Sequence, residues 1–133
     1  MTEKDPTGRS QHAPGAKLDA GKLRPALVLG GFARALAAVT AVGTFGAAKY
    51  TDDGWISVPK GTERYDDACL RHWLAEKSGE PVDKDSELEH AAHTAWNALA
   101  RLDLLIRQRE ISPQPPASNG AEVFIRYPRE ANE

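Results

Sequence analysis

A row of polar side chains recurs at helical spacing in the last third of the chain. His90, His93, Asn97 and Arg101 follow one another at intervals of three and four residues, which places them on one face of a helix. Two imidazoles, an amide and a guanidinium can bind a metal, a water or a phosphate. Their spacing alone fits a functional site and a polar surface equally well.

A second polar pattern lies on the preceding helical stretch. Glu63, Asp67 and Arg71 are spaced i, i+4 and i+8, so two carboxylates and a guanidinium share one face. Ordinary surface pairs between Glu or Asp and Arg would give the same pattern. If the two helices pack antiparallel, this acidic face approaches a set of further candidate ligands. These are Asp85, Glu89, His90 and His93.

Such a mixed set predicts a divalent metal site inside a helical bundle. Carboxylate oxygens suit Mg²⁺, and imidazoles would also admit Mn²⁺. By the helical step of about 100° per residue, His72 lies more than a right angle from Asp67, so we expect it to point elsewhere. Zinc signatures are missing: the sequence has no HExxH motif and a single cysteine, Cys69. It also has no His-Asp doublet, so the metal-dependent phosphohydrolases named for that doublet are a poor match. We expect Cys69 to be a buried structural thiol.

Basic and aromatic residues elsewhere could contact a nucleotide. Lys17, Lys22, Arg24 and Lys49 surround the first apolar segment, and Trp55 follows it in a loop. Together they could bind phosphates and stack on a base. Separately, each is more often surface charge or a core aromatic, and the sequence has no phosphate-binding glycine loop.

Three helical segments must position these residues. The first runs over residues 26–42 after Pro25, is apolar nearly all round and should be central to the core. The second runs over 62–77 with Thr62 as its cap. The third runs over 86–110, capped by Asp85 or Ser86, and packs antiparallel to the second after a short connection.

The third segment also carries an apolar stripe, which we expect to be core. Its members are Leu88, Ala92, Ala95, Leu99, Leu102 and Ile106. The sequence thus predicts an all-α protein, a small helical bundle spanning residues 15–110. A flexible arm over 1–14 precedes it, and a Pro-rich tail over 111–133 follows. A short β-like run at 122–127 would pair with a partner chain or lie disordered.

Composition narrows the class of protein. The 133 residues suffice for one domain, and 17 basic against 19 acidic residues leave a net charge of -2. This balance gives no reason to expect nucleic acid or a membrane surface as a partner. The N-terminus has no apolar run of signal-peptide length, and the longest apolar stretch is broken by Arg34. We expect a soluble cytoplasmic protein.

Four ordered motifs resemble a known family. They are GAKLDAGKLRP, FGAAKY with the following Trp55, YDDACLRHWLAEKSGEPVDKDS, and HAAHTAWNAL. In this order they are similar to the phage-encoded dATP/dGTP diphosphohydrolases, relatives of the MazG-like all-α nucleotide pyrophosphohydrolases. The resemblance covers residues 15 to 106.

The resemblance implies an activity and its partners. Such enzymes cleave a (deoxy)nucleoside triphosphate between the α and β phosphates with Mg²⁺ or Mn²⁺, and their relatives are dimers or tetramers. We therefore expect a nucleoside triphosphate substrate, a homo-oligomer, and host cytoplasm as the location if the chain is phage-encoded. The family pattern falls on residues from Lys17 to Asn97, and it includes His72, Glu80 and Asp83.

The sequence departs from the pattern in two places. Asp85, Ser86 and Glu87 stand where the family commonly has Glu-Ser-Gly, so Glu87 replaces a turn glycine. The Glu-Glu-x-x-Glu and Glu-x-x-Asp runs of MazG-like proteins do not occur in the expected helices.

With the resemblance, roles can be assigned to the candidate residues. We expect Asp67 to bind metal with help from Glu63, Asp85 or Glu89, and His90 or His93 to bind metal or position water. The predicted substrate-binding residues are Lys17, Lys22, Lys49, Trp55, Arg71, His72 and Asn97. Two alternatives remain open: a non-catalytic helical interaction module of a phage or mobile element, and a triphosphohydrolase that releases tripolyphosphate.

Overall fold

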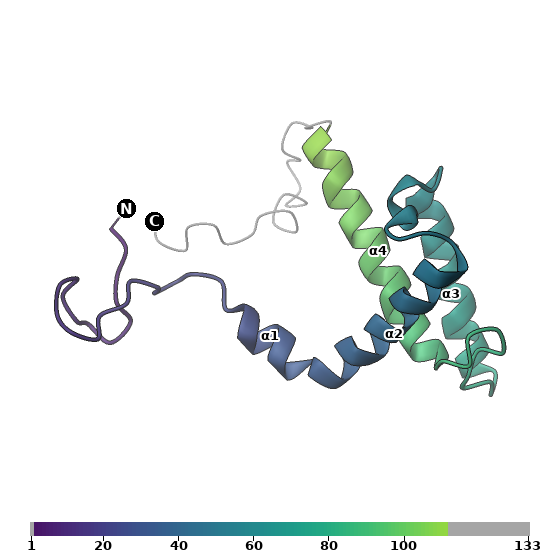
Figure 1. The fold of residues 1–133 in the computed structure, drawn as a ribbon, viewed down its shortest axis with the longest axis horizontal. Helices are drawn as coiled ribbons and strands as arrows, with labels where there is room; N and C mark the ends of the chain where they lie inside the picture. The colour runs from purple at the N-terminus through teal and green to yellow at the C-terminus, as the bar shows by residue number, and fades with distance from the viewer. Residues whose placement is uncertain (1, 112–133) are drawn as a thin grey trace. The chain divides into compact units, whose positions relative to one another are not determined.

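The computed structural model describes residues 2–111 of the 133. Their elements, in chain order, are α1 (Pro25–Gly31), α2 (Ala33–Lys49), the 3-10 helix η1 (Gly54–Ser57), α3 (Gly61–Lys77) and α4 (His90–Ile111) (Figure 1). Within this range the only β pairing is one isolated bridge between Val82 and Glu89. The predicted all-α class is confirmed, and the expected strand at 122–127 lies outside the described residues.

The chain divides into two compact units, with the boundary after Gly30. In the first unit, the Asp5 carboxylate accepts hydrogen bonds from the Thr7 hydroxyl and from the backbone N–H of Lys17, the latter at 2.8 Å. These bonds, the Thr7 hydroxyl first, lower the pKa of Asp5 to about 2. Lys22 Nζ pairs with Glu3 Oε1 at 2.6 Å. The first unit therefore already engages Lys17 and Lys22 in local contacts.

The first apolar segment forms two helices and not the single helix predicted over 26–42. The break lies at Phe32 (φ −98°, ψ 19°), directly after Gly30 and Gly31. Glycine is costly inside a helix, so adjacent glycines are a favourable place for an interruption. The expected central burial is also wrong, because α1 has no buried residue and Val42 is the one buried residue of α2.

The antiparallel packing predicted for the next two helices is confirmed. α3 and α4 lie side by side and are joined at one end by the loop of residues 78–89 (Figure 1). Cys69 Sγ contacts the Thr94 carbonyl at 3.4 Å, and Asp66 pairs with Arg101 at 3.3 Å. A residue nearer the start of α3 thus contacts a residue nearer the end of α4, as expected for an antiparallel pair.

Both helices begin differently from the prediction. α3 begins at Gly61 after Lys60, which adopts a left-handed conformation (φ 54°), so Thr62 is not the cap. α4 begins at His90, four residues later than expected. The reason is local: Glu87 has a left-handed φ of 61°, which a helix does not accept. The backbone N–H of His90 instead donates to the Pro81 carbonyl at 3.0 Å.

The burial of α4 reverses part of the expected apolar stripe. Ala92 is buried as predicted, but Leu99 and Leu102 are 48% and 49% exposed. The most buried residues of α4 are Ala92, Ala100, His90, His93 and Asn97. On α4 two small alanines and three polar residues are thus buried, while these two larger leucines remain partly exposed.

No single helix among the described residues is long and apolar enough to span a membrane. α1 and α2 meet the length and composition criteria only when they are taken together across their break.

Candidate functional site

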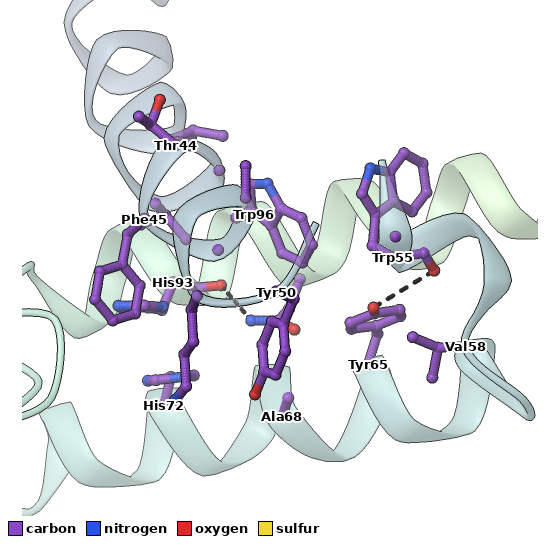
Figure 2. A pocket seen from close by; sticks show the side chains of 18 of the residues that line it. Thr44, Phe45, Tyr50, Trp55, Val58, Tyr65, Ala68, His72, His93 and Trp96 are labelled. Atoms are coloured by element: carbon purple, nitrogen blue, oxygen red, sulfur yellow. Dashed lines mark hydrogen bonds between the residues drawn. The ribbon is translucent and has the colours of Figure 1, made fainter. Parts of the chain in front are cut away.

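The second unit contains a groove of about 1170 Å³ (Figure 2). Its walls come from α2, the loop with η1, α3, residues 83–85 and α4. Most of the predicted substrate-binding residues line it, namely Lys49, Trp55, Arg71, His72 and Asn97. The groove therefore gathers residues that lie far apart in the sequence.

An aromatic group forms one part of the groove. The Trp96 ring lies edge-on to Trp55 at 6.2 Å and to Tyr65 at 5.7 Å between ring centroids. The Tyr65 hydroxyl donates to the Trp55 carbonyl at 3.4 Å, which ties α3 to η1 (Figure 2). Phe45 and Tyr50 add two more rings to the lining. These faces offer stacking surface to a planar base.

Three histidines gather at the other part of the groove, where His72 and His93 line it and the buried His90 lies behind them. The rings of His72 and His93 stack at 4.3 Å with an angle of 8° between their planes (Figure 2). His72 Nδ1 lies 2.8 Å from His90 Nδ1. The expectation that His72 points elsewhere is therefore wrong. His72 and Asp67 do lie on different faces of α3, but the helix turns the His72 face toward α4 and leaves Asp67 exposed.

His93 belongs to a hydrogen-bond chain that determines its tautomer. Asp83 Oδ2 accepts from the backbone N–H and the hydroxyl of Ser86, both at 2.9 Å. The Ser86 hydroxyl, having donated its proton to Asp83, accepts from Leu88 N–H at 3.2 Å and from His93 Nε2 at 2.7 Å. The proton of the neutral His93 ring is thus on Nε2, and Nδ1 holds the lone pair.

His90 is the most buried of the three and lacks a full set of partners. Its exposed fraction is 4%, and its Nε2 has no hydrogen-bond partner among residues 2–111. The nearest charged group is Glu80, whose Oε2 lies 3.7 Å from that nitrogen. A buried ring nitrogen without a partner costs free energy, so this position needs an explanation.

Burial controls the charge of the cluster. Burial, followed by the neighbouring imidazoles, lowers the pKa of His72. Burial also lowers the pKa of His93, although Asp83 opposes it. Burial alone would raise the pKa of Asp83, but the two bonds from Ser86 hold it below its ordinary value. The imidazoles of His72 and His93 are therefore neutral at neutral pH and lie beside one carboxylate.

Cationic side chains approach the groove from α2 and α3. Lys49 Nζ pairs with Asp85 Oδ2 at 2.7 Å, and this hydrogen bond raises the pKa of Lys49. Arg64 and Arg71 are also among the lining residues. The buried Asn97 donates its amide N–H to the His93 carbonyl at 2.8 Å, which uses one of its donors and leaves its oxygen available.

The predicted acidic metal ligands are not gathered in one place. Glu63, Asp67 and Glu89 are exposed and do not line the groove, and Asp85 pairs with Lys49. Within residues 2–111, one set of three side chains has the spacing of metal ligands: His72, Asp83 and His90. The metal roles of the four acidic residues stay predictions. Lys17 and Lys22 belong to the first unit and stay predictions as well.

The sequence contained signals for three further residues of the site. Tyr65 precedes His72 by seven residues and therefore shares its face of α3. Trp96 follows His93 by three residues and shares the polar face of α4. Asp83 precedes Ser86 by three residues, a spacing typical of a side chain that closes a turn. The first two resemble ordinary core aromatics, which is why the sequence alone does not mark them.

Comparison with known proteins identifies the family of the chain. No curated protein and no solved structure matches the chain. A family model described as "dATP/dGTP diphosphohydrolase, N-terminal" matches residues 12–114. The match covers more than three quarters of the sequence and includes every residue of the groove. The chain therefore belongs to the dATP/dGTP diphosphohydrolase N-terminal family, as the ordered motifs predicted.

Proposed function

We propose that this protein is a metal-dependent nucleoside triphosphate pyrophosphohydrolase that converts dGTP or dATP to the monophosphate and pyrophosphate. The family is named for a diphosphohydrolase activity on these two nucleotides. We further propose Mg²⁺ or Mn²⁺ as its cofactor, a role in phage nucleotide metabolism and the host cytoplasm as its location.

The groove of the second unit carries the proposal. It combines aromatic rings for a base with Lys49, Arg64 and Arg71 for phosphates. The neutral imidazole of His93 lies in the same groove. A nucleoside triphosphate requires all three kinds of group, whereas an apolar ligand or a protein surface does not require the cations beside a buried His cluster.

The residues present fit a divalent ion. The groove contains a carboxylate, Asp83, beside imidazoles whose pKa is lowered, so their nitrogens remain free to bind a cation at neutral pH. A bound ion would neutralise triphosphate charge and lower the pKa of water.

The reaction is a substitution at the α-phosphorus. The oxygen of a water molecule forms the new bond, and the bond from the α-phosphorus to the α,β-bridging oxygen breaks. Pyrophosphate leaves with that oxygen. His93 Nδ1 takes a proton from the water, while the chain from Asp83 through Ser86 holds the ring in place. Lys49 and Arg71 bind the phosphates, since positioning and charge dominate such reactions.

Product analysis tests the proposal. The purified protein is incubated with dGTP, dATP and the other common nucleotides in the presence of Mg²⁺ or Mn²⁺. We expect dGMP or dAMP with one pyrophosphate for each turnover, and a loss of at least about 100-fold in kcat for His93→Gln, as for removal of a general base. Release of tripolyphosphate and nucleoside would instead identify a triphosphohydrolase.

The interaction-module alternative predicts a different result. A non-catalytic helical module would turn over none of the nucleotides with either metal, and Asp67→Ala would bind and fold like the unsubstituted protein. That combination of outcomes would refute the proposed enzymatic activity.

A further inference from the structure

We propose that His72, Asp83 and His90 together hold a divalent transition-metal ion at the floor of the groove. The inference deepens the proposed function and rests on it for the role of the ion in nucleotide hydrolysis. The site itself is defined by the side chains alone. It differs from the set of Glu63, Asp67, Asp85 and Glu89 expected from the sequence.

The three side chains have the spacing of one coordination shell. One ligand atom from each residue lies within 4.8 Å of the other two. Opposite ligands of an ion with bonds of about 2.1 Å are about 4.2 Å apart, and neighbouring ligands are about 3 Å apart. The 2.8 Å between His72 Nδ1 and His90 Nδ1 is close to the neighbouring value. Small movements of the side chains would close the shell.

Protons alone do not satisfy the two imidazoles. If the proton between the two Nδ1 atoms comes from His72, His90 carries its own proton on Nε2, which has no acceptor within hydrogen-bond distance in the described part of the chain. If His90 donates that proton, its Nε2 becomes a buried lone pair without a donor. A cation between the two Nδ1 atoms places the His90 proton on Nε2, facing the Glu80 carboxylate at 3.7 Å.

Glu80 then completes a common feature of metal sites. A metal-bound imidazole usually donates its other N–H to a carboxylate, which orients the ring and strengthens the ligand. The charge of a bound ion would draw Glu80 toward His90 Nε2 and shorten the present 3.7 Å. The unpartnered nitrogen is thus explained as the outer side of a metal ligand.

One carboxylate oxygen of Asp83 binds Ser86, and the other is available to a metal ion. Its Oδ2 accepts both hydrogen bonds from Ser86. Its Oδ1 accepts no hydrogen bond from the described residues and is available to a cation. His72 is held by its stacking on His93, so each ligand has a second contact that fixes its direction. The ring of His93 itself is anchored to Ser86 and stays outside the ligand set.

The donor set indicates which ions fit. Two imidazoles and one carboxylate are typical ligands of Mn²⁺, Fe²⁺, Co²⁺ or Zn²⁺, whereas Mg²⁺ prefers oxygen ligands and retains most of its water. His72 and Asp83 line the groove and His90 lies behind them, so a bound ion would keep open positions toward the groove. We therefore expect preference for a transition metal over Mg²⁺ at this site.

Metal binding without nucleotide tests the inference directly. The full chain is stripped with a chelator and titrated with Co²⁺, with its visible absorption as readout, and with Mn²⁺, with loss of the free-ion electron paramagnetic resonance signal as readout. We expect one ion per chain and absorption bands that show nitrogen ligands. Excess Mg²⁺ should displace the ion poorly.

Variants locate the ligands. We expect Asp83→Asn, His72→Gln and His90→Gln each to weaken Co²⁺ binding by at least about 100-fold, and Glu80→Gln by about 10-fold, as for an outer-shell partner. His12→Gln is the matched control, since it removes the one histidine outside the cluster, which lies in the first unit. Circular dichroism checks folding. If His90→Gln fails to fold, the variants at the partly exposed His72 and Asp83 still test the site.

Two results would overturn the site: absence of a stoichiometric ion, or loss of binding in Asp67→Asn with full binding in Asp83→Asn and His72→Gln. Metal binding at the cluster without nucleotide hydrolysis would leave the site standing and refute the proposed function. Nucleotide hydrolysis by variants that lack the cluster ligands would leave the proposed function standing and refute the role of this site in it.

Discussion

Lys49 and Asp85 form the ion pair that borders the groove. Their charged atoms are 2.7 Å apart, and both side chains are substantially exposed. An exposed pair contributes little to folding because water and salt screen it. The pair therefore matters chiefly for the availability of Lys49 to a phosphate, and the two residues can be separated by substitution.

Replacing each partner should affect hydrolysis differently. Lys49→Gln removes a charged phosphate ligand, and we expect KM for dGTP to rise about tenfold, as for loss of one charge-assisted hydrogen bond. Asp85→Asn releases Lys49 from its partner, so KM should stay constant or fall, with kcat within about threefold. Steady-state kinetics on both variants measures this. A collapse of kcat in Asp85→Asn would instead restore Asp85 as a metal ligand.

The thiol of Cys69 should be unreactive in the folded protein. Burial raises its pKa, and its sulfur contacts the Thr94 carbonyl at 3.4 Å. Because the thiolate is the reactive form, a raised pKa lowers the reactive fraction at any pH below it. We expect iodoacetamide at pH 8 to label the native chain at least about tenfold more slowly than the chain in denaturant. Equal rates would show that α3 and α4 do not enclose this residue.

The loop between α3 and α4 positions Asp83 and Ser86, and its geometry depends on Glu87. This residue has a φ of 61°, where a side chain is strained and glycine is not. The family commonly has glycine at this position, and the structure explains why. The glycine of the family pattern therefore indicates a positive φ at this position, which the presence of glutamate in this sequence does not suggest.

Glu87→Gly should stabilise the protein. The strain energy relieved in the folded chain exceeds the entropic cost of ordering the more flexible glycine. We therefore expect a gain of about 1 kcal/mol in the free energy of unfolding. Urea denaturation measures it. Lys84→Gly in the same loop is the control, since Lys84 does not have positive φ, and it should lose a few tenths of a kcal/mol. A less stable Glu87→Gly variant would contradict the claim that Glu87 is strained in the native loop.

The approach of α2 to α4 depends on a glycine. A Cβ at Gly43 would lie 3.0 Å from Trp96 Nε1, whereas a Cβ at Gly46 would meet nothing within 4 Å. Both glycines lie inside α2, where alanine is the better helix former. The pair thus separates helix propensity from packing.

Alanine at these two positions should give opposite results. We expect Gly46→Ala to raise the free energy of unfolding by roughly 0.5–1 kcal/mol through helix propensity. Gly43→Ala should gain nothing or lose stability, because it displaces the Trp96 ring, and Gly43→Val should lose more than about 1 kcal/mol. Thermal unfolding compares the three variants. Equal stabilisation by both alanines would mean that Trp96 does not contact α2 closely.

At the scale of the whole molecule, large apolar side chains remain exposed on the outer faces of α3 and α4. Trp73 and Leu74 on α3 and Leu99 and Leu102 on α4 are each about half exposed. Covering such residues removes apolar surface from water and therefore lowers the free energy of the protein. The homo-oligomer predicted from the sequence is a proposal for which these faces provide the surface.

A charged substitution on α4 should dissociate the proposed oligomer. We expect the unsubstituted chain to be at least a dimer in light scattering at tens of micromolar, and the double variant Leu99→Lys with Leu102→Lys to be a monomer. Ala98→Lys, which adds one lysine at an exposed neighbouring position, is the control and should keep the oligomer. An unsubstituted chain that is monomeric under these conditions would contradict the proposal.

Local chemistry was sufficient to predict the all-α class, the antiparallel packing of α3 and α4, and the family. Proline, glycine and hydrophobic spacing are properties of short segments, and the order of the motifs is contained in the chain. The periodicity of His90, His93 and Asn97 likewise showed that they share a face. It did not show whether that face is inside, because a polar row and an apolar row are equally regular.

Only the tertiary structure decided which faces meet. α3 directs Tyr65 and His72 toward α4 and leaves Glu63 and Asp67 in water, and this rotation of α3 is set by the packing of whole helices. The same packing places the leucines of α4 outside and its histidines inside. A helical wheel relates residues of one helix to each other, but the rotation of that helix against its neighbour depends on contacts from both. The sequence thus determined the family and the histidines of the site, and the fold determined their partners.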